Sequence, residues 1–434
     1  MIQNGFLKVA ILLFALSAVV AYAGDGQVDI LPSGSETFTI TESGSYVLTG
    51  NVAMTADVTC IDVNAHNVTI NLNGHTLTGT ESGTGDGINS TNYNNLHIFN
   101  GMVTKFGGSG IAGYSGAVIS EVTATENGVN GIYAGSNVCI TNCVARKNFK
   151  WGIKVGNSGV ITSCSSYDNN EAGDCAGIEV LSNCSVIGCV SNNNIYSGSE
   201  NKDAYGIKAW KFNLIKDNVC VVNNATQNGA YNKSCGIYTD EGCTIINNTC
   251  ADQEGNGQYT DSYGIYASNG CTISGNSCFR NRALGDSGDA FGISCADGCT
   301  VINNTCRDND TTIAAGGQAI GIKVGDSSFV RGNTCSDQTT AGSSSAMGIS
   351  GDNGCRIEKN LCNGNQGESV NSCGIYIKTG LEKCSVIDNT TYDNTTGINL
   401  SSGSHYCAEN VCSDGITNTS SAILGTGDRS NITY

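Results

Sequence analysis

Residues capable of acid–base chemistry gather most densely between Arg280 and Asp289, in the run Arg-Asn-Arg-Ala-Leu-Gly-Asp-Ser-Gly-Asp. Asp308 and Asp310 follow further along the chain. Carboxylates are the ligands that calcium prefers, and a basic side chain beside them can abstract a proton. The same residues also suit a solvated loop on which opposite charges balance, because exposed ion pairs require no function. We favour the ion-paired loop, and the catalytic residues stay unknown.

Histidine adds little acid–base capacity to these groups. The four histidines are His66, His75, His97 and His405. His75 lies in the polar run Asn-Gly-His-Thr, which indicates a structural turn rather than a catalytic base. Glycoside hydrolysis would require two carboxylates at a defined separation, and a sequence does not supply that distance.

Cysteine is abundant, with 23 residues, and the chain has no Cys-x-x-Cys motif. In an exported chain disulfide bonds are the first expectation, and an odd number leaves at least one thiol unpaired in a monomer. Cysteine also serves as a small buried apolar residue. A thiolate row holding a metal or redox centre is the interpretation that we favour least, because His405 beside Cys407 is the only close His/Cys pair. We predict no metal site.

A sequence repeat determines where these cysteines and charged residues lie. Thirteen Gly-Ile pairs recur at intervals of 21 to 30 residues between Gly87 and Ile398. In most repeats a second apolar residue follows eight positions after the isoleucine, and a third residue, usually small, follows five positions later. From Ala124 to Cys412 this third position holds mainly Ala, Ser and Cys, and in the later repeats an Asn precedes it by two. A fixed pattern at variable spacing is typical of a solenoid whose loops vary in length.

Each repeat predicts three short strands separated by turns, and no segment shows a helical period. A strand this short cannot bury its apolar face alone, whereas like strands stacked in parallel about 4.7–4.9 Å apart close a continuous interior. The repeated Asn indicates a tight turn, because Asn tolerates the left-handed conformation. We therefore expect an all-β parallel solenoid of about 13–14 three-strand coils with an N-terminal cap.

The unit Gly236-Ile-Tyr-Thr-Asp-Glu-Gly-Cys-Thr-Ile-Ile-Asn-Asn-Thr-Cys250 resembles the right-handed parallel β-helix repeat of the pectin-lyase-like superfamily. The Asn-Gly-His-Thr run is similar to the opening coil of periplasmic copper-accessory and carbohydrate-binding relatives. The resemblance implies the fold over nearly all of the chain, but no single activity, because this fold hosts lyases, hydrolases, epimerases, phage spikes and non-catalytic surface proteins.

The catalytic signatures of these relatives have no clear match here. The calcium ligands and basic catalyst of the lyases are not recognisable, and the paired aspartates and Gly-His-Gly of the polygalacturonases are missing. The Asp-Pro-x-His of the alginate epimerases cannot occur in a chain whose only proline is Pro32.

Stacked coils would place like cysteines above one another. One row contains Cys220, Cys250, Cys278, Cys306, Cys335 and Cys362, and a second contains Cys243, Cys271, Cys299 and Cys355. We expect the two rows on successive strands of the coil. Vertical neighbours would have Cα atoms about 4.8 Å apart, within the range that a disulfide accepts, although the facing Cβ geometry is tight. A bridge from Cys220 to Cys250 would stabilise the fold by about 3 kcal/mol. Bridged thiols and free buried thiols both stay open.

The residue after each Gly-Ile is expected to face water. On consecutive coils these residues are Tyr133, Lys154, Glu179, Lys208, Tyr238, Tyr266, Ser294 and Lys323. Tyrosine rings stack on sugar faces, and Lys and Glu hydrogen-bond hydroxyl groups, so the row predicts a site for an extended glycan. A solubilised sheet face is the alternative, because Tyr and Lys also suit a sheet surface. We expect the residues that precede Gly-Ile to form an internal aromatic stack: Trp151, Tyr205, Tyr263 and Phe291.

Charge and the first residues bound the protein's environment. Lys and Arg total 21 against 38 for Asp and Glu, a net charge of −17, which disfavours binding to nucleic acid. Lys8, the apolar run from Val9 to Val20 and the end Ala21-Tyr-Ala23 predict a cleaved secretory signal peptide rather than a membrane anchor. We expect no membrane span after cleavage, and a secreted, extracellular or cell-surface protein, with the periplasm as the alternative compartment.

We expect a signal peptide at 1–23, an N-terminal cap and first strands at 24–60, the parallel β-helix at 61–412 and a C-terminal tail or cap at 413–434. The predicted function is the binding of a polysaccharide or cell-surface glycan, or a stiff extracellular structural role, without catalysis and without a cofactor. A polysaccharide lyase acting on an acidic polysaccharide, with calcium, is the alternative that the resemblance implies. A filament subunit is a second alternative, because a rod shape permits self-association.

Overall fold

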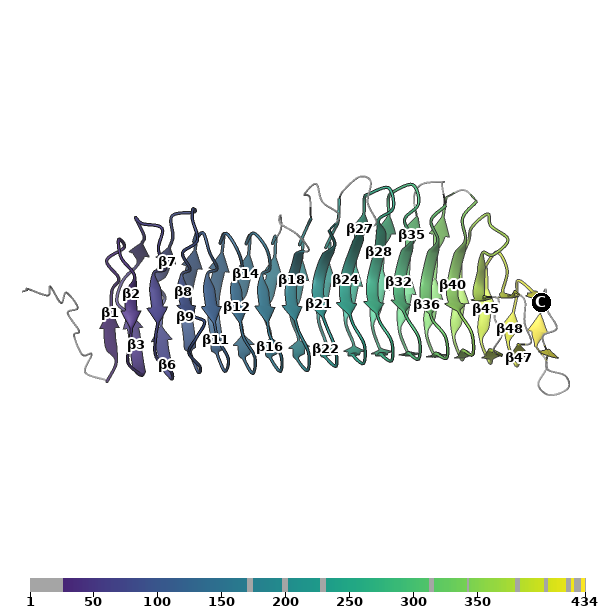
Figure 1. The fold of residues 1–434 in the computed structure, drawn as a ribbon. Coiled ribbons are helices and arrows are strands. Elements are labelled where there is room, and N and C mark those ends of the chain that lie inside the picture. Colours follow the sequence, from purple (N-terminus) through teal and green to yellow (C-terminus); the bar gives the residue numbers. More distant parts are fainter. Residues whose placement is uncertain are drawn as a thin grey trace, which may run out of the picture.

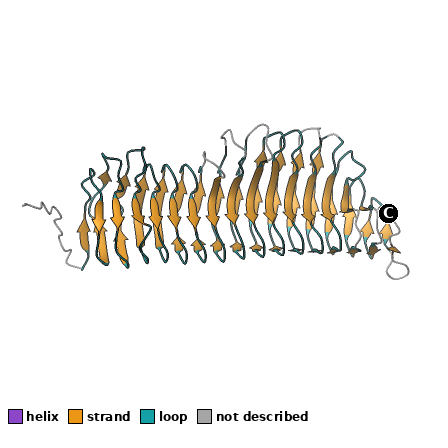
Figure 2. Ribbon diagram, in the orientation of Figure 1, coloured by secondary structure: helices purple, strands orange, loops and turns teal. Residues whose placement is uncertain are grey.

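A computed structural model describes residues 26–169, 175–196, 202–226, 232–311, 316–341, 343–378, 383–401, 405–418, 423–424 and 431–433. The predicted signal peptide lies outside these residues. Within the described ranges every regular element is a β-strand, and the strands wind into one right-handed parallel β-helix, as predicted (Figures 1 and 2). No helix of membrane-spanning length and apolarity occurs in this part of the chain.

The Gly-Ile repeats stack in one parallel sheet, here called the first sheet. Their isoleucines pair in register from Ile88 to Ile398, and all thirteen are 0% exposed. Three further strands extend the sheet beyond the thirteen Gly-Ile repeats. One of them carries a fourteenth Gly-Ile dipeptide, Gly415-Ile416, that the sequence analysis missed. The sixteen strands are β2 (Phe38–Ile40), β5 (Ile61–Val63), β8 (Ile88–Ser90), β10 (Ile111–Gly113), β12 (Ile132–Ala134), β15 (Ile153–Val155), β18 (Cys175–Val180), β21 (Ala204–Ala209), β24 (Lys233–Thr239), β28 (Asp261–Ala267), β32 (Ala290–Cys295), β36 (Ala319–Val324), β40 (Ala346–Gly351), β43 (Cys373–Ile377), β46 (Ile398–Leu400) and β49 (Ile416–Asn418).

The other two sides of each coil belong to a 31-stranded sheet with two arms that join at β9 (His97–Thr104) and β11 (Val118–Thr125). The first arm otherwise contains β1 (Val28–Ile30), β3 (Gly44–Leu48), β6 (Val68–Asn71), β13 (Cys139–Thr141), β16 (Val160–Thr162), β19 (Ser185–Ile187), β22 (Leu214–Lys216), β25 (Thr244–Ile246), β29 (Thr272–Ser274), β33 (Thr300–Ile302), β37 (Phe329–Arg331), β41 (Arg356–Glu358), β44 (Ser385–Ile387), β47 (Tyr406–Ala408) and β50 (Ile423–Leu424). The second arm contains β4 (Val52–Ala53), β7 (Thr76–Thr78), β14 (Val144–Arg146), β17 (Ser165–Tyr167), β20 (Val190–Asn192), β23 (Val219–Val221), β26 (Thr249–Ala251), β30 (Ser277–Phe279), β34 (Thr305–Arg307), β38 (Thr334–Ser336), β42 (Leu361–Asn363), β45 (Thr390–Tyr392), β48 (Val411–Cys412) and β51 (Ile432–Thr433).

The longer connections of the middle coils form a small sheet of their own. Its four strands are β27 (Glu254–Gly255), β31 (Arg282–Ala283), β35 (Asp310–Thr311) and β39 (Thr339–Thr340). Figure 1 shows these connections rising above the coils between β24 and β40. The loops that vary in length are therefore partly ordered by the same coil-to-coil pairing as the rod.

Buried asparagines hold the turn between the two arms. Asn276 Nδ2 donates to Asn304 Oδ1 at 3.0 Å in the next coil and to the Ile245 carbonyl at 3.0 Å in the preceding coil. The ladder consists of Asn218, Asn248, Asn276, Asn304, Asn333, Asn360, Asn389, Asn410 and Asn431. The expectation that these asparagines adopt the left-handed conformation is wrong. From Asn218 to Asn410 the residue before each one adopts it, as in Asn303 with φ 55°, and this turns the ladder side chain into the rod.

A second amide ladder, which the sequence analysis missed, follows the second arm. It consists of Asn127, Asn148, Asn169, Asn194, Asn223, Gln253, Asn281, Asn309, Gln338, Asn365 and Asn394, and ends on Asp414. Its members stand three residues after the small third residue of each repeat. Exchanges of Asn for Gln hid this column, because an identity search does not equate two side chains that end in the same amide.

The 23 cysteines are all free thiols, so the bridged alternative, including a bridge from Cys220 to Cys250, is not the one that the structure has. In-register parallel neighbours keep their Cβ atoms about as far apart as the strands, about 4.8 Å, whereas a disulfide needs about 3.8 Å. The small-buried-residue interpretation explains the Cys220 row, whose side chains fill the narrow interior next to the isoleucines.

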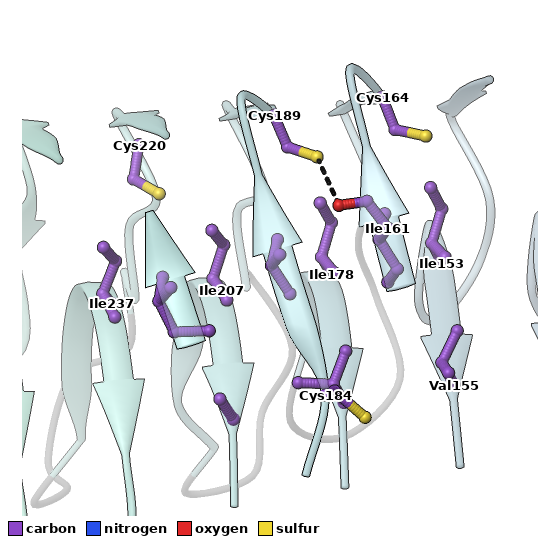
Figure 3. Close-up of a cluster of buried hydrophobic side chains, with 14 of the residues drawn as sticks. Ile153, Val155, Ile161, Cys164, Ile178, Cys184, Cys189, Ile207, Cys220 and Ile237 are labelled. Carbon is purple, nitrogen blue, oxygen red and sulfur yellow. Dashed lines mark hydrogen bonds between the residues drawn. The ribbon is translucent and has the colours of Figure 1, made fainter. Parts of the chain in front are cut away.

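Other cysteines replace ladder asparagines. Cys189 Sγ donates to the Ile161 carbonyl at 3.8 Å (Figure 3), in the position where Asn218 Nδ2 donates to a carbonyl of the preceding coil at 2.9 Å. The Cys243 row lies in the turn before a first-arm strand rather than on the strand itself. There the Cys243 thiol donates to the Trp210 carbonyl at 3.1 Å.

Burial keeps four thiols of the Cys220 row protonated. Desolvation raises the pKa of Cys250, Cys278, Cys306 and Cys335 well above its ordinary value. A thiol must ionise to act as a nucleophile or to bind a metal. The interior row is therefore suited to packing.

Replacing Asn360 by Ala is expected to lower the free energy of unfolding by about 2–4 kcal/mol, because it leaves the backbone N–H and the Nδ2 of Asn333 without their acceptor. The neighbouring Lys359 has φ 57° and lies outside the ladder, so Lys359→Gly is expected to change stability by less than about 1 kcal/mol. Urea denaturation measures both variants. Equal losses in the two variants would contradict the ladder's role.

Candidate functional site

The predicted row after Gly-Ile forms along the first sheet. Coil-to-coil pairing joins Tyr133, Lys154, Glu179, Lys208, Tyr238, Tyr266, Ser294 and Lys323 in that order. We call these eight residues the row. The register of the isoleucines fixes it, because each member immediately follows a buried isoleucine on the same strand.

Water exposure along the row is uneven. Tyr133 is exposed, whereas Ser294 is 8% exposed and Glu179 only 5%, which corrects the expectation that both face water. Lys154 makes the burial of Glu179 possible, because its Nζ lies 3.5 Å from Glu179 Oε1 and neutralises the buried carboxylate. Removing Lys154 alone would leave a buried charge unpaired, so Glu179 and Lys154 act as one unit.

The aromatic residues that precede Gly-Ile form a buried cluster, but it is separate from the rod interior in which they were expected. The cluster contains Ala176, Tyr205, Cys235, Tyr263, Phe291, Ile320, Met347 and Cys373, with Trp151, Tyr238, Tyr266 and Tyr376 packed against it. Tyr263 stacks on Phe291 with ring centroids 4.9 Å apart. The rings therefore support the row's tyrosines from the side.

Two tyrosines of the row present a continuous aromatic surface. The Tyr238 and Tyr266 rings lie 5.2 Å apart with an interplanar angle of 3°. Tyr205 meets Tyr238 edge to face at 5.2 Å, and Tyr263 meets Tyr266 in the same way at 5.3 Å. These contacts restrain both half-buried rings before any ligand arrives.

Lysines lie over the aromatic rings on this side of the rod. Their Nζ atoms are 3.6 Å from the Trp151 centroid for Lys154, 4.8 Å from Tyr205 for Lys208, 5.3 Å from Phe291 for Lys323 and 5.6 Å from Tyr266 for Lys233. Such contacts hold long side chains in place through cation–π attraction. The sequence analysis missed Lys233, because it precedes Gly-Ile by three residues and lies outside the row.

A column of carboxylates borders the aromatic cluster and was also missed. Asp261 Oδ1 accepts the Asp289 N–H at 2.9 Å, and Asp289 Oδ1 accepts the Gln318 N–H at 2.7 Å. Asp203 accepts the Lys233 N–H in the same way at 2.8 Å. The recurring order Asp-x-aromatic-Gly-Ile was the signal that would have revealed the column.

One member of the column is electrostatically unlike the others. The Tyr263 hydroxyl donates to Asp261 Oδ2 at 2.7 Å, whereas the ring two residues after Asp289 is Phe291, which has no hydroxyl. Burial raises the pKa of Asp289 from 3.8 to about 6, and the neighbouring Asp261 carboxylate adds to the rise. Asp289 therefore changes its protonation state in mildly acidic solution.

The loop that looked most like an active site is paired internally. Arg280 makes a bidentate contact with Asp252, at 2.7 Å for both hydrogen bonds, and Arg307 pairs with Asp308 at 2.7 Å. Arg282 lies 4.0 Å from Asp310. This geometry agrees with the ion-paired interpretation. Within the described ranges no group of three His, Cys, Asp or Glu side chains is placed to hold a metal ion.

Two hollows lie away from the row, next to the second amide ladder. One, of about 610 Å³, is bordered by Glu126, Lys147 and Asp168. The other, of about 920 Å³, is bordered by Asp337, Thr339 and Asp393. Neither contains a residue of the row. The sequence analysis predicted neither hollow, because both depend on how turns of successive coils overhang one another.

Comparisons with known proteins agree with the fold. A family model described as a right handed beta helix region matches residues 235–412. The A-module of a mannuronan C-5 epimerase from Azotobacter vinelandii is 14% identical, with a TM-score of 0.32, over 94% of this chain and 89% of that chain. A mutant of a periplasmic alginate epimerase is 10% identical, with a TM-score of 0.37, over 93% and 78%. A tailspike protein mutant of an E. coli bacteriophage, in complex with a pentasaccharide, is 13% identical, with a TM-score of 0.33, over 92% and 72%.

Comparison with curated proteins gave no match. No site residue is carried over from the solved structures.

Replacing Asp289 by Asn is expected to stabilise the protein at pH 7.5 but not at pH ~4. The pKa of Asp289 is raised from 3.8 to about 6, so between these values the native state holds a proton that the unfolded state has lost. The free energy of unfolding of the unsubstituted protein therefore falls as pH rises through this window, by at most about 3 kcal/mol. The variant lacks that loss.

Urea denaturation across this pH range measures the difference between the two proteins. The exposed Asp286, on the same loop, provides the control, and Asp286→Asn should show no such pH-dependent gain. A gain for Asp289→Asn that is equal at both ends of the range would show that the carboxylate's charge is not its cause.

Proposed function

We propose that this protein is a secreted or cell-surface rod that binds an extended glycan along the row without catalysing a reaction. The observation that carries the proposal is the register of the row, in which aromatic and lysine side chains, with the buried Glu179 among them, occupy equivalent places on consecutive coils. The spacing between coils is about 4.8 Å. That distance is close to the length of one sugar residue, so successive sugars can meet successive coils.

The tyrosine pair supplies the stacking surface. A pyranose ring has an apolar face of C–H groups, bordered by hydroxyl groups. The rings of Tyr238 and Tyr266, which stack in parallel planes with centroids 5.2 Å apart, can pack against that face, and the flanking Lys208 can donate hydrogen bonds to the hydroxyls. Because neighbouring rings already restrain both tyrosines, little side-chain entropy is lost on binding.

The local charge favours an anionic glycan. The chain as a whole has a net charge of −17, yet Lys154, Lys208, Lys233 and Lys323 gather on this one side of the rod. Glu179, Asp203, Asp261 and Asp289 lie beside these lysines, so the two signs of charge balance at the row and a polyanion meets less repulsion there than over the rest of the rod.

A polysaccharide lyase is the second candidate. The observation that favours it is Asp289, whose pKa of about 6 suits proton transfer, beside the row's Lys323. Incubation with acidic polysaccharides and calcium, with unsaturated products detected by ultraviolet absorption, separates the two functions. Robust turnover would replace the binding function by the enzymatic one.

The double substitution Tyr238→Ala and Tyr266→Ala is expected to weaken glycan binding about 10- to 100-fold, because it removes both stacking surfaces. A glycan array identifies the ligand, and calorimetry measures its affinity. Tyr392, an exposed tyrosine on the second arm, provides the control, and Tyr392→Ala should leave affinity unchanged.

Lys208→Ala is expected to lower affinity less and to reduce its dependence on salt, because it removes one half-buried positive charge from the row and leaves the Lys154–Glu179 ion pair in place. Array binding that survives both sets of substitutions in the row would contradict the proposed site.

A further inference from the structure

The turn between β21 and β22 departs from the pattern of its neighbours. In the equivalent turn of the other described coils from β12 to β40, the residue with positive φ is small or polar. These residues are Asn137, Ser158, Asn183, Gly242, Gly270, Gly298, Ser327 and Gly354. In the turn after β21 the same place is filled by Phe212, with φ 58°.

This conformation is unfavourable for a bulky residue, and burial does not compensate for it. Left-handed φ values crowd the Cβ atom of any residue except glycine. Phe212 is 58% exposed and Trp210 is 45% exposed, so two aromatic rings stand in water on one three-residue turn. Backbone strain combined with exposed aromatic surface is typical of a binding site rather than of packing.

The next coil accommodates the Phe212 ring. A Cβ atom at Gly242 would lie 2.6 Å from both Cδ1 and Cε1 of Phe212, so the ring lies directly over this glycine. Between the two aromatic residues, Lys211 Nζ pairs with Glu241 Oε1 at 2.5 Å. The turn thus combines two aromatic surfaces with a charged pair that can exchange hydrogen bonds with a ligand.

The turn also continues the row. Trp210 follows Lys208 by two residues, so it leaves the strand on the same outward side of the first sheet. Two aromatic side chains cover far less than the roughly 800 Å² per partner that a stable protein interface buries. A single sugar ring is of the right size for this surface.

We propose that Trp210 and Phe212 form an aromatic platform that stacks one sugar ring at the side of the row and thereby sets where a bound or branched glycan leaves it. This inference rests on the proposed function, since it concerns the same class of ligand. The platform is a binding subsite for a pyranose, with Lys211 and Glu241 as the hydrogen-bonding groups at its edge.

Phe212→Gly separates binding from folding. The substitution removes the ring and introduces glycine, the residue best suited to the positive φ at this position. The midpoint of urea unfolding should therefore stay the same or rise. The affinity for long uronic-acid oligosaccharides should fall about tenfold, as it should for Trp210→Ala. A length series from disaccharide to octasaccharide is measured by calorimetry, with Tyr392→Ala as the control variant.

The outcomes distinguish the platform from the row. If Phe212→Gly and Trp210→Ala bind every oligosaccharide as the unsubstituted protein does, while Tyr238→Ala/Tyr266→Ala loses binding, the platform is wrong and the row stands. If only the platform variants lose binding, the proposed platform is supported and the row is not the binding site. A lowered unfolding midpoint for Phe212→Gly would show that the ring serves the fold and would overturn the platform. If the unsubstituted protein binds no member of the series and no neutral cello-oligosaccharide, both proposals fail.

Discussion

The in-register stacking of parallel coils is the constraint on which the rest of this structure depends. Each coil closes with turns whose buried polar groups cannot reach water, so every such group must find its partner in the coil above or below. The two amide ladders meet this requirement, as Asn276 does by bonding to the coils on both sides. One misplaced coil would break both ladders and bury the wrong side of every strand.

The same stacking creates the candidate site. Residues that occupy the same position in successive repeats form a row on the surface, and no pocket is required. The rings of Tyr238 and Tyr266 stack in parallel planes because their strands are paired in register. Strand register alone, however, does not set exposure. Glu179 is buried beside Lys154, which pairs with its carboxylate, whereas Phe212 is exposed although its ring lies over Gly242 of the next coil.

The sequence predicted the columns well, because a solenoid converts spacing directly into spatial contact. The stack of Gly-Ile isoleucines, the column of small third residues and the Asn218 ladder all follow from residue spacing. The states of side chains were harder to predict. Whether Cys220 and Cys250 are bridged depends on Cβ separation, and the raised pKa of Asp289 depends on its burial and on the nearby Asp261 carboxylate. These properties depend on distances of an ångström or less, which residue spacing does not convey.

Amide hydrogen exchange tests the central claim most directly, because it measures the backbone N–H groups that the ladders bind. The N–H groups of Asn248, Asn276 and Asn304 each donate to the amide oxygen of the next ladder residue. We predict that they exchange as slowly as the buried strands of the first sheet, along the whole length of the ladder. Ladder N–H groups that exchange as fast as those of the exposed turns would contradict coil-to-coil stacking as the basis of the fold.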